Sequence, residues 1–125
     1  MKNREHIIGR YVAAYNDFDI DKMVADLDAS VKFENISNGV SNMTLIGLEA
    51  FRAQAEQAKN LFSERRQTIM AFYHQQDQTE IEIDYFAVLD TDLPNGLKKG
   101  DKLQLSGKSV FKFSGDKIIG LTDIS

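Results

Sequence analysis

The stretch Arg10–Asn35, RYVAAYNDFDIDKMVADLDASVKFEN, predicts two helices followed by a β-strand. Over residues 6–16 and again over residues 17–28, apolar side chains recur three and four positions apart, which places them on one face of a helix. Acidic residues open the second segment, where they stabilise the positive N-terminal end of a helix. The residues expected to face inward are Ile7, Ile8, Tyr11, Val12 and Tyr15 in the first helix, and Ile20, Met23, Val24 and Leu27 in the second.

Residues 30–37, SVKFENIS, alternate as a strand and place Val31, Phe33 and Asn35 on one side. Asn35 is therefore an amide on the more apolar side of this strand. An amide donates and accepts hydrogen bonds, but it has no proton affinity to use at neutral pH and cannot act as a general base. Two interpretations stay open: Asn35 contacts a ligand, or it satisfies backbone groups where its strand ends.

The rest of the chain predicts a third helix and four further strands. Residues 38–44 are polar and contain glycine, which is typical of a loop, and residues 48–62 carry apolar side chains at helical spacing. Strand-like segments follow at residues 65–74, 79–89, 102–113 and 117–124, with turn signals between them. This order indicates an α+β fold in which a curved antiparallel sheet wraps around three helices. Because three helices cannot cover such a sheet completely, we expect a cone-shaped cavity open at one end.

Composition and charge exclude several classes of function. The 125 residues are 42% hydrophobic, which suits one domain over residues 1–125, and the net charge is −4. Lys and Arg are scattered, so no nucleic-acid-binding stripe is present, and no segment approaches the roughly 20 apolar residues of a membrane span. Cysteine is absent, which fits a reducing compartment, and we expect a cytoplasmic protein without nucleic-acid or membrane partners. His6 and His74 have no further ligands at metal-binding spacing, so no metal site is expected.

The element order, with the segments quoted above and FKFSGDKIIGLTDIS at residues 111–125, resembles the nuclear transport factor 2-like superfamily, which has a cystatin-like fold. Within it, residues 10–35 resemble the ketosteroid isomerases, and residues 111–125 resemble the SnoaL-like branch. The resemblance implies a single SnoaL-like domain that needs no cofactor and takes a small hydrophobic molecule. It also implies a homodimer through the sheet face turned away from the helices, where Val88 and Val110 are apolar positions among many charged ones.

The resemblance also implies roles for individual residues. Tyr11 corresponds to the isomerase tyrosine that donates a hydrogen bond to the enolate oxygen, and Asp123 corresponds to the acid/base aspartate of the SnoaL-like polyketide cyclases. Asn35 stands where the isomerases have their aspartate base, and Ser109 stands where a protonated aspartate completes their oxyanion hole. These two replacements imply that the protein is not a classical ketosteroid isomerase.

The residues alone also draw attention to Asp123. Alternation over residues 117–124 groups Ile119, Leu121 and Asp123 on an apolar face, and a carboxyl buried without a cationic partner has a raised pKa that suits proton transfer near neutral pH. The alternative is an exposed carboxylate, or one that hydrogen-bonds a neighbouring strand. Tyr11 and Tyr15 are likewise either pocket residues or aromatic bodies whose hydroxyls reach water or a carbonyl. The complete predicted site has Asp123 and Tyr11 as catalytic residues and Tyr15, Phe33, Asn35, Tyr85, Ser109 and Phe111 as ligand-binding residues.

Two functions of different classes follow from this site. In the first, a cofactor-independent enzyme of isomerase, cyclase or dehydratase type uses Asp123 to move a proton on an enolisable carbonyl compound, with Tyr11 stabilising the enolate. In the second, the same cavity binds a small apolar molecule without turnover, or the sheet serves as a protein-interaction module. The amide at Asn35 favours the second function, and the acid at Asp123 favours the first.

Overall fold

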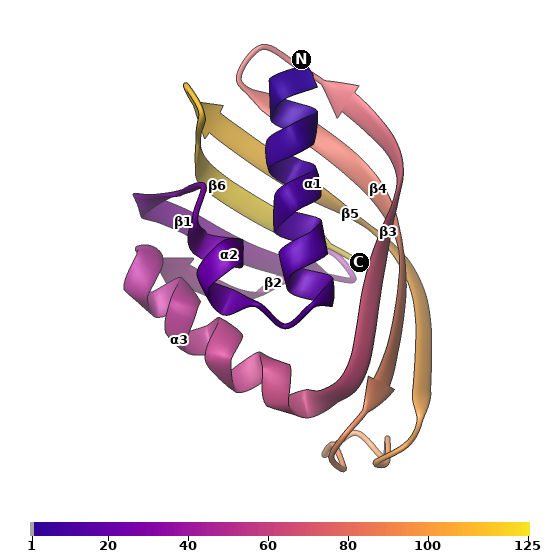
Figure 1. Cartoon of the computed structure of the whole chain (residues 1–125). Coiled ribbons are helices and arrows are strands. Elements are labelled where there is room, and N and C mark those ends of the chain that lie inside the picture. Colours follow the sequence, from indigo (N-terminus) through magenta and orange to yellow (C-terminus); the bar gives the residue numbers. More distant parts are fainter. Residues whose placement is uncertain (1) are drawn as a thin grey trace.

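A curved sheet of six strands carries three α-helices on its concave face (Figure 1), and the fold is α+β as predicted. The computed structural model describes residues 2–125. The helices are α1 (Lys2–Asn16), α2 (Ile20–Val24) and α3 (Leu48–Ala58), and a short 3₁₀ helix, η1 (Lys59–Leu61), follows α3. The strands are β1 (Leu27–Ser37), β2 (Val40–Ile46), β3 (Phe62–His74), β4 (Gln78–Leu89), β5 (Lys102–Ser114) and β6 (Lys117–Ile124).

The strand order across the sheet is β2-β1-β6-β5-β4-β3. Neighbouring strands are antiparallel except β1 and β6, which run parallel, so the sheet is mixed where the sequence predicts a wholly antiparallel one. The difference arises because the last strand enters the sheet between β1 and β5. The two-residue period of a strand shows which side chains share a face, but it does not identify a partner strand far along the chain.

Residues 38–44, which the sequence predicts as a loop, contain a tight turn and most of β2. Asn38 and Gly39 both have positive φ angles, 54° and 78°, and they connect β1 to β2 as a two-residue hairpin. The prediction was wrong because β2 is an edge strand of the sheet, so its polar residues Ser41, Asn42 and Thr44 are exposed to solvent within a strand and not within a loop. The predicted third helix is also too long, because α3 ends at Ala58.

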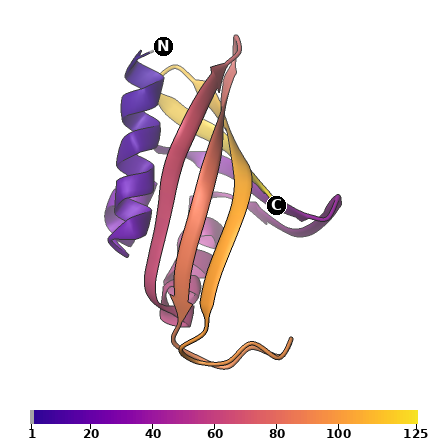
Figure 2. The same cartoon turned by 90° about the vertical axis from the view of Figure 1, so that its right-hand side faces the viewer.

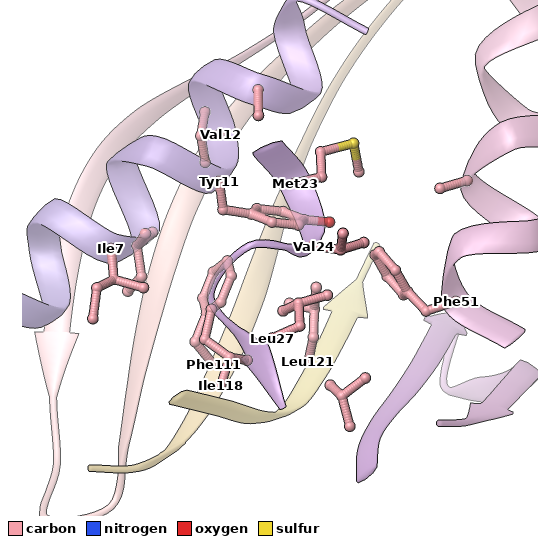
Figure 3. Packing of buried hydrophobic residues seen from close by; sticks show 14 of the residues in the cluster. Ile7, Tyr11, Val12, Met23, Val24, Leu27, Phe51, Phe111, Ile118 and Leu121 are labelled. Carbon is pink, nitrogen blue, oxygen red and sulfur yellow. The ribbon is translucent and has the colours of Figure 1, made fainter. Parts of the chain in front are cut away.

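The core lies between α1, α2 and the concave face of the sheet (Figure 3). Tyr11 of α1 packs edge-on against Phe111 of β5, with ring centroids 5.6 Å apart. A register shift between β5 and β6 leaves Ile119 unpaired and brings Ile118 fully inside, so Ile118 takes the inward place that the alternation predicts for Ile119. The residues predicted to face inward from the first two helices are all buried except Tyr15, which is half-buried. The second helix is shorter than predicted, because α2 ends at Val24 and Leu27 is the first residue of β1.

The helices do not cover the sheet evenly. Figure 2 shows α1 to one side of the long strands β3, β4 and β5, with the loop between β4 and β5 extending beyond their ends. In Figure 1, α3 runs below α1 and α2 and leads through η1 into β3. The space between α1, α3 and the inner face of β1 and β3 is where the candidate site lies.

Candidate functional site

Strand register brings three of the predicted polar residues into one row across the sheet. Asn35 of β1 is paired with Asp123 of β6, and Asp123 is paired in turn with Ser109 of β5. The Ser109 hydroxyl donates a hydrogen bond of 2.7 Å to Oδ1 of Asp123. The parallel β1–β6 pairing, which the sequence does not predict, is therefore what places Asn35 beside Asp123.

A cavity of about 390 Å³ opens in front of this row, between the helices and the sheet. Its lining is mostly apolar and includes Met23, Phe33 and Phe51. The rings of Phe33 and Phe51 pack edge-on, with centroids 5.6 Å apart. Polar groups enter this lining at only a few points: Tyr11, Tyr15, Asn35, Gln54, Arg65 and Asp123. An apolar cavity with a few convergent polar groups is the usual form of a small-molecule site.

Tyr11 presents its hydroxyl to this cavity. The side chain is 7% exposed, and Figure 3 shows the ring lying over Phe111 with its hydroxyl directed toward the side of the core where Phe51 lies. Within residues 2–125, every fully enclosed polar side-chain atom has a hydrogen-bond partner. The Tyr11 hydroxyl has no partner among these residues, so it is not enclosed and keeps surface toward the cavity. Burial raises the pKa of Tyr11, the nearby Asp123 carboxylate raises it further, and Arg65 lowers it.

Asp123 is half-buried and borders two cavities. Burial raises the pKa of its carboxyl from 3.8 to about 6, and the hydrogen bond from Ser109 opposes this effect without overcoming it. Oδ1 accepts the Ser109 hydrogen bond, whereas Oδ2 accepts none from residues 2–125 and is not enclosed. The carboxyl is thus oriented by one oxygen and has the other available for a ligand.

The second cavity, of about 170 Å³, lies on the β5 side of Asp123 and holds other predicted residues. Tyr85 and Ser109 line this smaller cavity, and Tyr15 lines both. The Tyr15 and Tyr85 hydroxyls are 2.9 Å apart and hydrogen-bond each other. One of them donates to the other, so only one of the two hydroxyl protons can be donated to a ligand. Burial is the main cause of the raised pKa of both tyrosines.

Of the two predicted ligand-binding residues Asn35 and Phe111, only Asn35 reaches a cavity. Asn35 borders both cavities, but its Nδ2 donates a hydrogen bond of 2.9 Å to Asn42 of β2. Phe111 is fully buried behind the Tyr11 ring and lines neither cavity, so its role is to support Tyr11.

Sequence reasoning missed Arg65, which lines the larger cavity and is only 3% exposed. The Arg65 Nε donates a hydrogen bond of 2.8 Å to the backbone oxygen of Tyr15, in the last turn of α1. Its guanidinium carbon lies 3.8 Å from the Tyr15 ring centroid and 4.5 Å from that of Phe18. Alternation along β3 gives the only sequence signal, because it places Arg65 on the same face as Gln67 and Ile69.

The two histidines do not line these cavities, and His74 has a structural role. Its Nε2 is 2.7 Å from Glu5 of α1 and its Nδ1 is 2.9 Å from Thr79 of β4, so it links the first helix to the sheet. Residues 2–125 contain no group of three or more His, Cys, Asp or Glu side chains arranged to hold a metal ion. None of the helices in this range has the length and apolar character that crossing a membrane would require.

Solved structures with this fold include several bacterial proteins of low sequence identity. A candidate polyketide cyclase from Xanthomonas campestris pv. campestris superposes with a TM-score of 0.85 at 18% identity, covering 99% of this chain and 90% of its own. A Catenulispora acidiphila protein with a ketosteroid isomerase-like fold gives a TM-score of 0.76 at 15% identity, covering 94% and 82%. A cystatin-fold protein from Novosphingobium aromaticivorans gives 0.73 at 17% identity, covering 96% of both chains.

At these identities, the solved structures establish the fold alone. No curated protein matches the chain. The family model of the SnoaL-like domain matches residues 8–121, which is nearly the whole chain, although α1 begins before this range and the end of β6, with Asp123, follows it. The protein therefore belongs to the SnoaL-like domain family.

Proposed function

We propose that the protein is an acid/base enzyme that acts on an enolisable carbonyl group of a small apolar compound, with Asp123 as the proton-transferring residue. The observation that carries this proposal is the meeting of two groups in one apolar cavity. Asp123 has an available Oδ2, and Tyr11 has an available hydroxyl. Proton transfer and enolate stabilisation are the two requirements of such chemistry, and each has one residue.

The chemistry follows from the two groups. The Asp123 carboxylate takes a proton from the carbon next to the carbonyl, and the electron pair of that C–H bond moves into an enolate. The Tyr11 hydroxyl donates a hydrogen bond to the developing enolate oxygen. Where a double bond lies next to the acidic carbon, the resulting dienolate takes the proton back from Asp123 at its γ-carbon, which gives isomerisation. Alternatively, the enolate carbon attacks a second carbonyl in the same molecule, which gives ring closure. In the latter case the new alkoxide is protonated by Asp123.

The Asp123 environment suits a base that works near neutral pH. Its pKa of about 6 leaves the carboxyl mostly ionised at pH 7, yet more basic than an ordinary aspartate. The Ser109 hydrogen bond fixes the direction of the carboxyl. Some candidate polyketide cyclases share this fold, which supports ring closure as one form of the reaction, although their activity is not transferred by fold alone.

The second candidate function is ligand binding without turnover. It is favoured by Asn35, because the residue at the isomerase base position is an amide that is already bonded to Asn42. Under this alternative, the cavity holds the same class of compound but no proton leaves it.

The proposed test measures proton exchange and does not require the natural substrate. The protein is mixed with 2-tetralone, an enolisable bicyclic ketone, in deuterated buffer, and loss of the α-proton signals is followed by NMR. Asp123→Asn is the test variant, because an amide oxygen still accepts the Ser109 hydrogen bond but takes no proton. Asp84→Asn is the matched control, because Asp84 is an exposed carboxylate on the outer face of β4.

The outcomes separate the two functions. Protein-dependent exchange that is lost in Asp123→Asn and kept in Asp84→Asn supports the enzyme. Equal exchange in wild type and Asp123→Asn rejects Asp123 as the base. Binding of 2-tetralone to the wild type without any protein-dependent exchange favours the binding function.

A further inference from the structure

Arg65 is a buried cation without an anionic partner. It is 3% exposed, and none of the ion pairs formed among residues 2–125 includes it. Buried arginines are normally paired, because an uncompensated charge in a low-dielectric surrounding is costly. The cavity that Arg65 lines is mostly apolar, and Asp123, the one carboxyl of its lining, forms no ion pair with it. The charge therefore needs another explanation.

The protein itself compensates part of this charge. Nε donates to the backbone oxygen of Tyr15, and this oxygen belongs to the negative C-terminal end of α1. The guanidinium also lies over the rings of Tyr15 and Phe18, which attract a cation through their π faces. These contacts fix the plane of the guanidinium and use only one of its five N–H donors on an oxygen acceptor.

The outer end of the guanidinium is left without a strong acceptor. Nη2 reaches only the sulfur of Met23, a weak acceptor, at 3.9 Å. Nη1 has no hydrogen-bond partner among residues 2–125, and because no enclosed polar atom in that range lacks a partner, Nη1 is open to the cavity. A guanidinium held by Nε and the ring faces, with Nη1 open to the cavity and Nη2 bonded only to a weak acceptor, can donate hydrogen bonds to the oxygens of a carboxylate.

We propose that Arg65 binds the carboxylate of an otherwise apolar aromatic acid, and that this residue selects the ligand of the cavity. This inference rests on the proposed function in one respect only, because it concerns the ligand of the same cavity. It assigns a negative charge to that compound. Arg65 holds the carboxylate at the β3 side, and the ring system lies against Met23, Phe33 and Phe51.

The test compares two probes that differ in charge and have nearly the same shape, 2-naphthoate and 2-naphthamide, by titration calorimetry at pH 7.5. The wild type is expected to bind the carboxylate roughly 10- to 100-fold more tightly than the amide, as a charged hydrogen-bonded pair provides. Arg65→Met keeps the bulk of the side chain and removes the charge, so this preference is expected to disappear. Arg66→Met is the matched control, since it removes the same charge from an exposed position next along β3.

If Arg65→Met does not fold, the comparison of the two probes on the wild type still tests the proposal. Arg65→Lys then serves as the second variant, because it keeps a charge but loses the planar guanidinium. Equal binding of the two probes to the wild type, or a preference that survives in Arg65→Met, would overturn the role of Arg65. This failure is distinct from failure of the proposed function. A carboxylate preference without proton exchange overturns the enzyme alone, and exchange of 2-tetralone without a carboxylate preference overturns the role of Arg65 alone.

Discussion

At the scale of single residues, the Asp123 carboxyl of the site lowers the free energy of unfolding when it is ionised. The pKa of Asp123 is raised from 3.8 to about 6, so between these values the native state binds more protons than the unfolded state. The free energy of unfolding therefore falls as pH rises from about 4 to about 6, and above that range the cost of holding the charged form is fully present. A shift of this size corresponds to on the order of 3 kcal/mol.

Asp123→Asn is accordingly expected to stabilise the protein at pH 7.5, by roughly 2–3 kcal/mol in the free energy of unfolding. The gain has a physical reason, because the amide carries no charge and still accepts the Ser109 hydrogen bond. Urea unfolding at pH 4 and at pH 7.5 measures it, and the gain should shrink toward pH 4. An Asp123→Asn variant no more stable than the wild type at pH 7.5 would contradict the raised pKa of the Asp123 carboxyl.

Tyr11→Phe separates chemistry from packing. The ring packs on Phe111 and is kept, while the hydroxyl, which has no protein partner among residues 2–125, is removed. The free energy of unfolding should therefore change by less than about 1 kcal/mol. Proton exchange of 2-tetralone should fall roughly 100-fold, as for loss of one oxyanion donor. A large loss of stability with unchanged exchange would mean that the hydroxyl is a structural group.

At the scale of elements, the β1–β2 hairpin forms one wall of the larger cavity through Met43 and Leu45. Its turn depends on Gly39, which has φ 78°. Gly39→Ala should destabilise the protein by about 1 kcal/mol, because an L-residue with a side chain resists that conformation. Gly9→Ala makes the same chemical change inside α1, where an added Cβ meets nothing within 4 Å. It should stabilise by up to about 1 kcal/mol. Urea unfolding of both variants should show that the free energy of unfolding falls in Gly39→Ala and rises in Gly9→Ala. A change in the same direction in both variants would contradict this account.

The elements also show what sequence can predict and where it stops. The helices near Tyr11 and Met23 and the strands of the second half were predictable, because each buries a periodic face of its own. The strand β2 was not, because only Met43 and Leu45 alternate inward, which is too short a period to distinguish a strand from a loop. Arg65 was missed for a different reason. Arginine is usually exposed, and its burial here depends on Tyr15 and Phe18 from a distant part of the chain.

At the scale of the whole molecule, the register of the sheet determines which residues meet. The sequence predicts Tyr11, Asn35 and Asp123 as site residues, and the larger cavity brings all three together. It could not predict that Tyr85 and Ser109 line a separate, smaller cavity, or that Phe111 lies behind Tyr11. These positions depend on how β5 packs under α1 and between β4 and β6, which no local pattern in the chain records.

The assembly of the molecule stays a prediction from the family resemblance. We propose a homodimer through the sheet face turned away from the helices, which would leave the cavity of each copy on the opposite side of its sheet. Sedimentation velocity at micromolar concentration should give the mass of two chains. A single species with the mass of one chain, 14.1 kDa, would contradict this proposal.

The central claim is that Asp123 transfers protons to and from a ligand in the cavity, and the pH dependence of exchange tests it most directly. The rate of protein-dependent deuterium exchange into 2-tetralone, corrected for exchange in buffer, is measured from pH 4.5 to pH 8 for the wild type and Asp123→Asn. Because the carboxylate form is the base, the wild-type rate should rise with pH, with a midpoint near the Asp123 pKa of about 6, and then level off. The Asp123→Asn rate should stay at the buffer level throughout. A wild-type rate without this midpoint, or the same profile in Asp123→Asn, would contradict the claim.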